Sequence, residues 1–324
     1  MNRRHFITLL GGTAAWPLAA RAQQAGSVLM IGLLWPGASP PAPPRMDAFR
    51  QGLRDSGLVE GRDVVIELRY AQGGLQQLPE LAAELVRLKV DVFQASGDLA
   101  PRVAQQATAT IPIVAFSDDI LGAGLIPSLS RPGGNMTGLT ILSPELSAKR
   151  LEVLRELLPR KLSRVAALWD PTTGTSQVAL TESAAQSLKI KLQILEVRRG
   201  DELAGVFETA RKEQAEALNI FSSPFLASLY RDIIELAAKH RMPAIYQWKE
   251  HAEAGGLVSY GPSLVGLWRQ TAVIVAKVLR GAQPADLPVE QPTKFELIVN
   301  AKTARALGLD IPPALLLRAD EVIE

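Results

Sequence analysis

The stretch S-R-P-G-G-N-M-T-G-L-T-I-L-S-P, residues 130–144, separates two similar halves of the chain. Four apolar runs alternating with helix-like segments precede it, and the same alternation resumes after it. Pro132, Gly133 and Gly134 favour a turn, and Gly138 tolerates dihedral angles that other residues resist. A turn followed by an extended, hydroxyl-bearing segment predicts a crossover between two lobes. An ordinary surface loop would explain the same residues.

The N-terminus has the pattern of a secretory leader. Arg3 and Arg4 precede an apolar run over residues 9–20, and Ala20-Arg21-Ala22 offers a small-residue cleavage site. The run is too short to span a bilayer, and the paired arginines fit the twin-arginine export route. A buried first helix is the alternative. We expect residues 1–22 to be a signal peptide and the mature protein to be periplasmic.

Composition excludes several classes of function. Cleavage after Ala22 removes three of the 35 basic residues and none of the 33 acidic ones, which leaves the mature chain almost neutral. A neutral chain without basic clusters indicates no nucleic-acid partner. The absence of cysteine excludes disulfides, thiolate metal sites and a cysteine nucleophile. We expect no cofactor and no metal, and a monomer.

Apolar runs alternate with amphipathic segments along the mature chain. Continuous runs such as residues 28–34 are typical of strands buried on both faces. Alternation of this kind predicts parallel sheets throughout, and 324 residues are enough for two cores. We predict an α/β fold with two Rossmann-like, doubly wound lobes. The last strand is expected at residues 295–300, before a short helix and a polar tail.

The candidate site follows from this topology, because ligands bind beyond the carboxyl ends of parallel strands. Hydroxyl-bearing helix starts attract a carboxylate, a carboxyl side chain can take an ammonium group, and aromatic rings can stack on an apolar body. An amino acid or a small aromatic or carboxylic acid would suit such a cleft. The candidate ligand-binding residues are Trp35, Ser96, Gly97, Asp98, Ser117, Asp118, Asp119, Thr140, Trp169, Asp170, Thr173, Ser222, Ser223, Tyr246 and Tyr260.

Each of these residues alone also has a structural explanation, since Ser and Asp commonly cap helices and strand-end aromatic residues are commonly core. Asp98, for example, is expected to cap the helix that follows it. The sequence offers little evidence for catalysis, since it contains neither a P-loop nor a G-x-S-x-G elbow. His240 is expected to be a solvated cation at a helix end, and His251 to lie at the surface. An enzyme that uses cleft carboxyls such as Asp118 and Asp119 stays the alternative.

A family resemblance is carried by several stretches in order along the chain. They are A-F-R-Q-G-L (48–53), L-P-E-L-A-A-E-L-V (78–86), G-A-G-L (122–125), R-P-G-G-N-M-T-G-L-T (131–140), S-P-E-L-S-A-K-R-L (143–151), Y-G-P-S-L (260–264) and V-E-Q-P-T-K-F-E-L (289–297). With the twin-arginine leader, they resemble the ABC-transporter substrate-binding proteins of the tryptophan-binding-protein type. The resemblance covers essentially the whole mature chain and says little about the ligand.

The resemblance implies a type I periplasmic-binding-protein fold with the ligand between two lobes. It implies hinge crossings near residues 137–143, 259–262 and 286–292. Lobe 1 is then expected to comprise residues 27–141 plus 261–286, and lobe 2 residues 142–260 plus 290–324.

The resemblance also implies a function without chemistry: a solute receptor that delivers its ligand to an inner-membrane ABC permease. A partner of a membrane sensor is a further alternative. Two departures bear on the ligand. Asp119-Ile120-Leu121 stands where many relatives have D-P-V, and Asp170 replaces an asparagine that is frequent among relatives.

Overall fold

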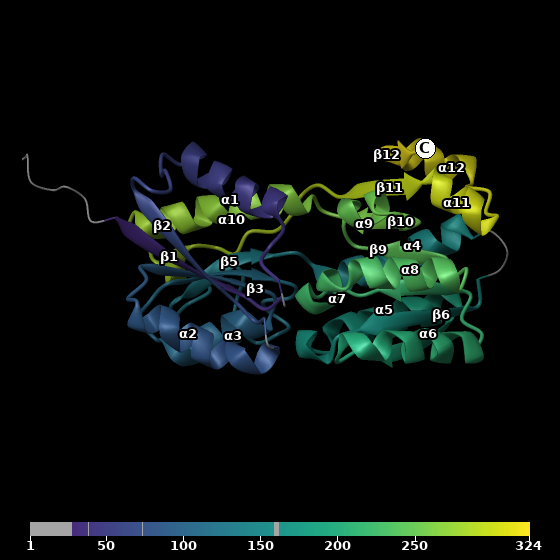
Figure 1. Ribbon diagram of the computed structural model, residues 1–324, viewed down its shortest axis with the longest axis horizontal. Helices are drawn as coiled ribbons and strands as arrows, with labels where there is room; N and C mark the ends of the chain where they lie inside the picture. The colour runs from purple at the N-terminus through teal and green to yellow at the C-terminus, as the bar shows by residue number, and fades with distance from the viewer. Residues whose placement is uncertain (1–27, 38, 73, 159–161) are drawn as a thin grey trace, which may run out of the picture.

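The computed structural model describes residues 28–37, 39–72, 74–158 and 162–324. Within these ranges the chain forms two α/β lobes that lie side by side, each built around its own sheet (Figure 1). The predicted fold class is confirmed. The expected signal peptide, residues 1–22, lies outside the described residues.

Lobe 1 is built on a five-stranded, wholly parallel sheet with the order β2-β1-β3-β4-β5. Its strands are β1 (Leu29–Trp35), β2 (Val64–Tyr70), β3 (Val92–Ser96), β4 (Ile113–Ser117) and β5 (Met136–Thr140). Helices α1 (Pro43–Asp55) and α10 (Leu264–Leu279) cover one face, and α2 (Leu78–Arg87) and α3 (Leu99–Ala107) cover the other (Figure 1). Ile31 and Leu33 pack toward α1 and α10, whereas Leu34 packs toward α2 and α3. Burial on both faces explains why β1 is apolar along its length.

Lobe 2 contains a seven-stranded sheet with the order β12-β11-β10-β9-β8-β6-β7. Its strands are β6 (Arg164–Trp169), β7 (Lys191–Glu196), β8 (Ala217–Ile220), β9 (Ala244–Tyr246), β10 (Val258–Gly261), β11 (Glu296–Asn300) and β12 (Glu321–Ile323). Its helices are α4 (Ser143–Leu157), α5 (Ser176–Leu188), α6 (Leu203–Lys212), α7 (Pro224–Ser228), α8 (Tyr230–Lys239), α9 (Lys249–Glu253), α11 (Ala301–Leu307) and α12 (Pro313–Arg318).

One edge of this sheet departs from the prediction of parallel strands throughout. Strand β11 runs antiparallel to β10, because the chain re-enters lobe 2 from lobe 1 at the end of the sheet where β10 leaves it. The expected polar tail is also wrong in part, since residues 321–323 form β12 beside β11. None of the described helices is long and apolar enough to cross a membrane.

The chain passes between the two sheets three times within the described ranges. β5 leads into α4 of lobe 2, β10 leads into α10 of lobe 1, and the segment after Asp286 leads back into β11. The third passage pairs with β5: Glu290 N donates to the Gly138 carbonyl at 2.9 Å, and Thr140 N donates to the Glu290 carbonyl at 3.0 Å. The stretch in the middle of the sequence therefore becomes part of the hinge.

Gly138 is required by the contact between β4 and β5. Its φ is +147°, and a Cβ atom placed on it would lie 2.0 Å from the carbonyl oxygen of Ala115 on β4. A side chain at this position would therefore overlap the backbone of the neighbouring strand.

We expect Gly138→Ala to lower the free energy of unfolding by at least about 2 kcal/mol, because backbone strain and overlap with Ala115 add. Gly205→Ala is the matched control: it lies in helix α6 with nothing within 4 Å of an added methyl group. The control should gain up to about 1 kcal/mol from higher helix propensity. Urea unfolding measures both variants. Wild-type stability of Gly138→Ala would contradict the close approach of the two strands.

Candidate functional site

The carboxyl ends of both sheets meet at a cavity between the lobes. Lobe 1 contributes the residues that follow β1, β3 and β4, and lobe 2 contributes the residues after β8 and β9. The cavity holds about 30 Å³, whereas sites for small organic ligands usually measure about 300–1,000 Å³. The lobes are thus closed on each other and leave no room between them for an organic ligand of that size.

Asp118 lies at the centre of this cavity, directly after β4. Its Oδ1 accepts a hydrogen bond from Ser143 Oγ at 3.2 Å and another from Ser222 Oγ across the cleft. The residue is 4% exposed. Burial, followed by the charge of Asp98, raises the pKa of Asp118 to about 7. A cation beside this carboxyl would favour its ionised form.

The Asp98 carboxyl supports the backbone that carries Asp118. Its Oδ1 accepts hydrogen bonds from Ser117 Oγ at 2.5 Å, Asp118 N at 3.0 Å and Asp119 N at 3.2 Å. Asp98 occupies the predicted N-cap position of α3, but its side chain makes no capping bond and turns to the neighbouring loop instead. Burial raises the pKa of Asp98, and its Oδ2 has no hydrogen-bond partner among the described residues.

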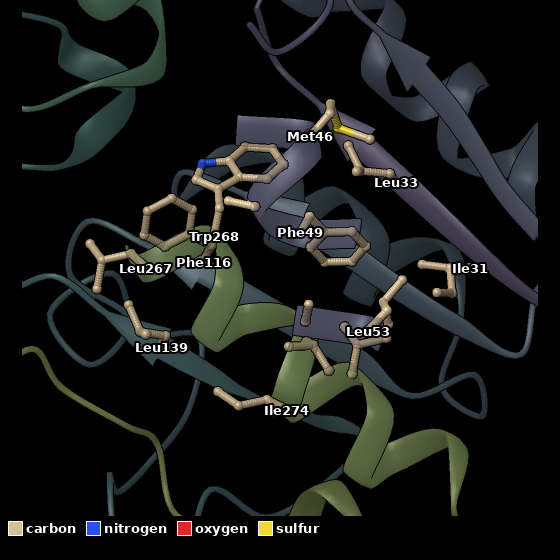
Figure 2. Close-up of a cluster of buried hydrophobic side chains, with 14 of the residues drawn as sticks. Ile31, Leu33, Met46, Phe49, Leu53, Phe116, Leu139, Leu267, Trp268 and Ile274 are labelled. Atoms are coloured by element: carbon tan, nitrogen blue, oxygen red, sulfur yellow. The ribbon is translucent and has the colours of Figure 1, made fainter. Parts of the chain in front are cut away.

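Aromatic residues form one wall of the cavity. Trp268 of α10 makes edge-to-face contacts with Trp35 at 5.8 Å and Phe116 at 6.3 Å between ring centroids. Figure 2 shows Trp268, Phe116 and Phe49 among the apolar side chains of lobe 1. Trp248 comes from lobe 2, yet it packs into this same cluster. The wall is therefore continuous with the core of lobe 1, and Trp248 fills part of it while the lobes are closed.

Two arginines near the cavity form no ion pair among the described residues, although the charge of Glu250 acts on Arg45. Arg45 in the first turn of α1 lines the cavity, and no carboxylate of the described residues lies within ion-pair distance of it. Arg150 of α4 is fully buried; its Nη2 donates to Ser147 Oγ at 2.8 Å and its Nη1 to the Tyr260 carbonyl at 3.3 Å. Burial lowers the pKa of both arginines, and the charge of Asp118 opposes this effect at Arg150.

The structure brings seven of the fifteen predicted residues to one place. Those that line the central cavity are Trp35, Ser96, Gly97, Ser117, Asp118, Ser222 and Ser223. A smaller adjoining cavity shares Gly97 and Pro224 with the central one and is lined by Asp98, Asp170 and Thr173. Tyr246 lines a further chamber inside lobe 2.

The other four predicted residues make local contacts outside these cavities. Asp119 Oδ1 accepts a hydrogen bond from Gly122 N at 2.9 Å, and Thr140 Oγ1 accepts one from Ile120 N at 3.4 Å. Trp169 Nε1 donates to the Gly174 carbonyl at 3.0 Å, and the Tyr260 ring stacks on Phe295 at 6.2 Å. These contacts give each side chain a structural role, and their part in binding stays a prediction.

Sequence reasoning missed the cavity residues that lie on helices. Arg45 and Trp268 are on α1 and α10, so a rule that inspects strand ends does not reach them. Phe116 lies inside the apolar run of β4 and was indistinguishable from core by pattern. For Arg45, the one available signal was a basic residue directly after a proline-rich loop at a helix start.

Both predictions about the histidines are wrong. His251 is 4% exposed, and its ring stacks on Tyr230 with centroids 5.0 Å apart. The His240 side chain is 6% exposed and stacks on Phe207 at 5.7 Å. Neighbouring charged residues suggested a solvated environment, but the aromatic partners come from other elements. Across the described part of the chain, no group of three or more acidic or histidine side chains could hold a metal ion.

Comparison with known proteins places the chain among binding proteins. A family model described as ABC transporter substrate binding protein matches residues 41–323. The chain is 24% identical over 280 residues to a tyrosine-binding protein of Clostridioides difficile, covering 82% of this chain and 78% of that protein.

Solved structures show the same fold. A conserved domain protein from Vibrio cholerae is 26% identical with a TM-score of 0.83, covering 91% of this chain and all of that one. A Streptococcus pneumoniae ABC domain in complex with L-Trp is 24% identical with a TM-score of 0.80, covering 90% of this chain and all of that one.

Replacing Asp118 should change how stability depends on pH. Folding raises the pKa of this carboxyl from 3.8 to about 7. Between these values the folded state holds a proton that the unfolded state has lost, so this group costs the wild type stability as pH rises. We expect the free energy of unfolding of Asp118→Asn, relative to wild type, to grow from about pH 4 to about pH 7 and then stay level. Urea unfolding across this range tests the slope.

Asp63→Asn provides a control of opposite sign. A hydrogen bond from Arg62 lowers the pKa of Asp63. Such a carboxyl contributes stability above its unfolded pKa and loses it as pH falls. The Asp63 variant should therefore be less stable than wild type at neutral pH and approach it in acid. If the stability difference from wild type changed with pH in the same direction for both variants, the raised pKa of Asp118 would be refuted.

Proposed function

Because the chain belongs to the ABC transporter substrate binding protein family, we propose that it is the periplasmic solute receptor of an ABC importer. It binds an amino acid or a small aromatic or carboxylic acid between its lobes and hands it unchanged to an inner-membrane permease. The observation that carries this proposal is the composition of the central cavity. One carboxyl, one unpaired cation and an aromatic wall line the same space.

These groups complement the zwitterion of an α-amino acid. The ammonium group of the ligand pairs with Asp118, where it favours the ionised carboxylate and replaces part of the lost hydration. The carboxylate of the ligand faces Arg45, whose guanidinium offers a planar set of donors. The rings of Trp35, Phe116 and Trp268 receive the apolar part of the ligand.

Closure of the lobes couples binding to recognition by the permease. Ser222 of lobe 2 donates to Asp118 of lobe 1, so the carboxyl is completed only when the lobes approach. A ligand shifts the lobes toward the closed state only by binding that state more tightly. A ligand that contacts both Asp118 and the residues after β8 binds the closed state more tightly, because in the open state it can contact only one lobe.

The relatives support an aromatic amino acid as the ligand class. One relative is a tyrosine-binding protein, and one structural neighbour holds L-Trp. A periplasmic enzyme that uses the cleft carboxyls, and a ligand-sensing partner of a membrane receptor, are the other classes. Recovery of a bound compound in altered form would favour the enzyme.

We expect Asp118→Asn to weaken binding of L-tryptophan and L-tyrosine by about 100-fold, which is about 2.7 kcal/mol. Loss of a charge-assisted contact to the ammonium group is the physical reason. Isothermal titration calorimetry on mature protein measures the effect. Asp63→Asn is the matched control, since this carboxylate accepts hydrogen bonds from Val59 N and the Arg62 side chain and lines none of the cavities; its affinity should stay within about threefold.

The same titration with a desamino analogue, such as indole-3-propionate, separates the ammonium contact from other effects. Wild type should bind this analogue weakly, and Asp118→Asn should bind it no worse than wild type does. Equal loss of affinity for the analogue and the amino acid would overturn the pairing with Asp118.

Replacing Arg3 and Arg4 together by lysine should block export, because the twin-arginine route reads the arginine pair. Fractionation of the native host should then find the protein in the cytoplasm with its leader attached. Wild-type protein should appear in the periplasm and lack residues 1–22. Normal export of the lysine variant would exclude the twin-arginine route and leave general secretion.

A further inference from the structure

A second chamber adjoins the central cavity inside lobe 2. The two spaces share walls formed by Ser223, Ala227 and Trp248. The chamber holds about 10 Å³, which is room for about one water molecule while the lobes are closed. Its other polar or aromatic lining residues are Phe221, Tyr230, Tyr246, Gln247 and His251.

Two polar side chains in this chamber are buried without partners. His251 is 4% exposed, and neither ring nitrogen has a hydrogen-bond partner among the described residues. Gln247 is also 4% exposed, and its Nε2 lacks a partner within the same ranges. The imidazole is held by aromatic contacts instead: it stacks on Tyr230 at 5.0 Å and meets the edge of Tyr246 at 5.7 Å.

Packing alone does not account for these residues. Leaving a buried donor or acceptor unpaired costs free energy, whereas apolar groups of the same shape would avoid the cost. Burial, followed by the charges of Arg45 and Arg150, lowers the pKa of His251 to about 3. The imidazole is therefore neutral and presents one donor nitrogen and one acceptor nitrogen.

We propose that His251 and Gln247 form a specificity subsite for the tip of the ligand's side chain, and that this tip carries a hydroxyl or an N–H group. The inference rests on the proposed function, since it requires an amino acid with its ammonium group at Asp118. From there the side chain passes Ser223 and Trp248 into the chamber. Tyr246 flanks its ring, and the neutral imidazole and the Gln247 amide complete its hydrogen bonds.

Trp248 controls the space between Asp118 and the chamber. It lines both cavities and packs into the aromatic cluster of lobe 1, although its neighbours Gln247 and α9 belong to lobe 2. When lobe 2 moves away, Trp248 leaves this cluster and carries the chamber with it. The ligand ring then takes the place that the indole vacates, and the chamber receives the polar tip.

L-Tyrosine and L-phenylalanine test the inference directly, because they differ by one hydroxyl group. Sites that hydrogen-bond a hydroxyl reject the analogue that lacks it, so wild type should bind tyrosine at least about 100-fold more tightly. His251→Phe should bring this ratio to within about threefold, by weakening tyrosine and strengthening phenylalanine. Gln247→Leu should reduce the ratio in the same direction. Calorimetric titration of the mature chain measures all of these affinities.

His240→Phe is the matched control. This second buried histidine stacks on Phe207 and lies 3.9 Å from Glu208, and it lines neither cavity. The tyrosine-to-phenylalanine ratio of this variant should equal that of wild type. The ligand-free His251→Phe protein should also melt at or above the wild-type temperature, because an unpaired polar group has been removed.

Equal affinity of wild type for both ligands, or an unchanged ratio in His251→Phe, would overturn the subsite and leave the receptor standing. If wild type binds neither of them, nor L-tryptophan, the aromatic amino-acid class fails and the subsite fails with it, whereas a receptor for another amino acid or small carboxylic acid stands. If His251→Phe does not fold, the ratio of tyrosine to phenylalanine affinity measured for Gln247→Leu tests the subsite in its place.

Discussion

Burial of opposite charges where the lobes meet is the constraint on which the site depends. Asp118 on lobe 1 and Arg150 on lobe 2 are almost entirely removed from water, and neither forms an ion pair among the described residues. Such charges are costly unless nearby charges and hydrogen bonds compensate them. Here the two charges lie within electrostatic range of each other, so closure of the lobes supplies part of the compensation. Under the proposed function, the ammonium group of the ligand would supply the remainder at Asp118.

The hinge and the site share backbone, which links motion to binding. Ile141 N donates to the Ser117 carbonyl at 3.0 Å, and Ser143 N donates to the Asp118 carbonyl at 3.1 Å. The first passage between the lobes is thus bonded to the loop that carries the central carboxyl. Gly138 lets this passage approach β4 closely, and the third passage is bonded to it through Glu290. The loop that carries Asp118 is therefore bonded to the first passage and, through it, to the third.

The sequence pattern predicted those features of the fold that follow from a regular alternation of buried strands and helices. The apolar run of β1 follows from two covered faces, and Asp118 was found because carboxyl ends of parallel strands converge. The antiparallel direction of β11 relative to β10 could not be predicted from the sequence, because it depends on where the third passage re-enters lobe 2. Trp268 was equally hidden: its spacing on α10 is that of a core residue, which it is, and only the tertiary fold brings its ring to the cavity. Local charge misled for His251, whose burial comes from Tyr230 and Tyr246.

Unpaired polar atoms give the site a second signature that the sequence does not carry. Asp98 Oδ2, Trp268 Nε1 and the ring nitrogens of His251 are all buried without partners in the described structure, and each belongs to a residue that lines one of the adjoining cavities. Native proteins pair nearly all such atoms, because desolvation without a hydrogen bond is unfavourable. Six further buried atoms without partners in the described structure, such as Gln94 Oε1 and Asn219 Oδ1, lie away from these cavities, so only the atoms at the cavity walls bear on the proposed ligand. Under the proposed function, a matching solute would recover on binding part of the free energy that the unpaired atoms at the cavity walls cost the closed, ligand-free state.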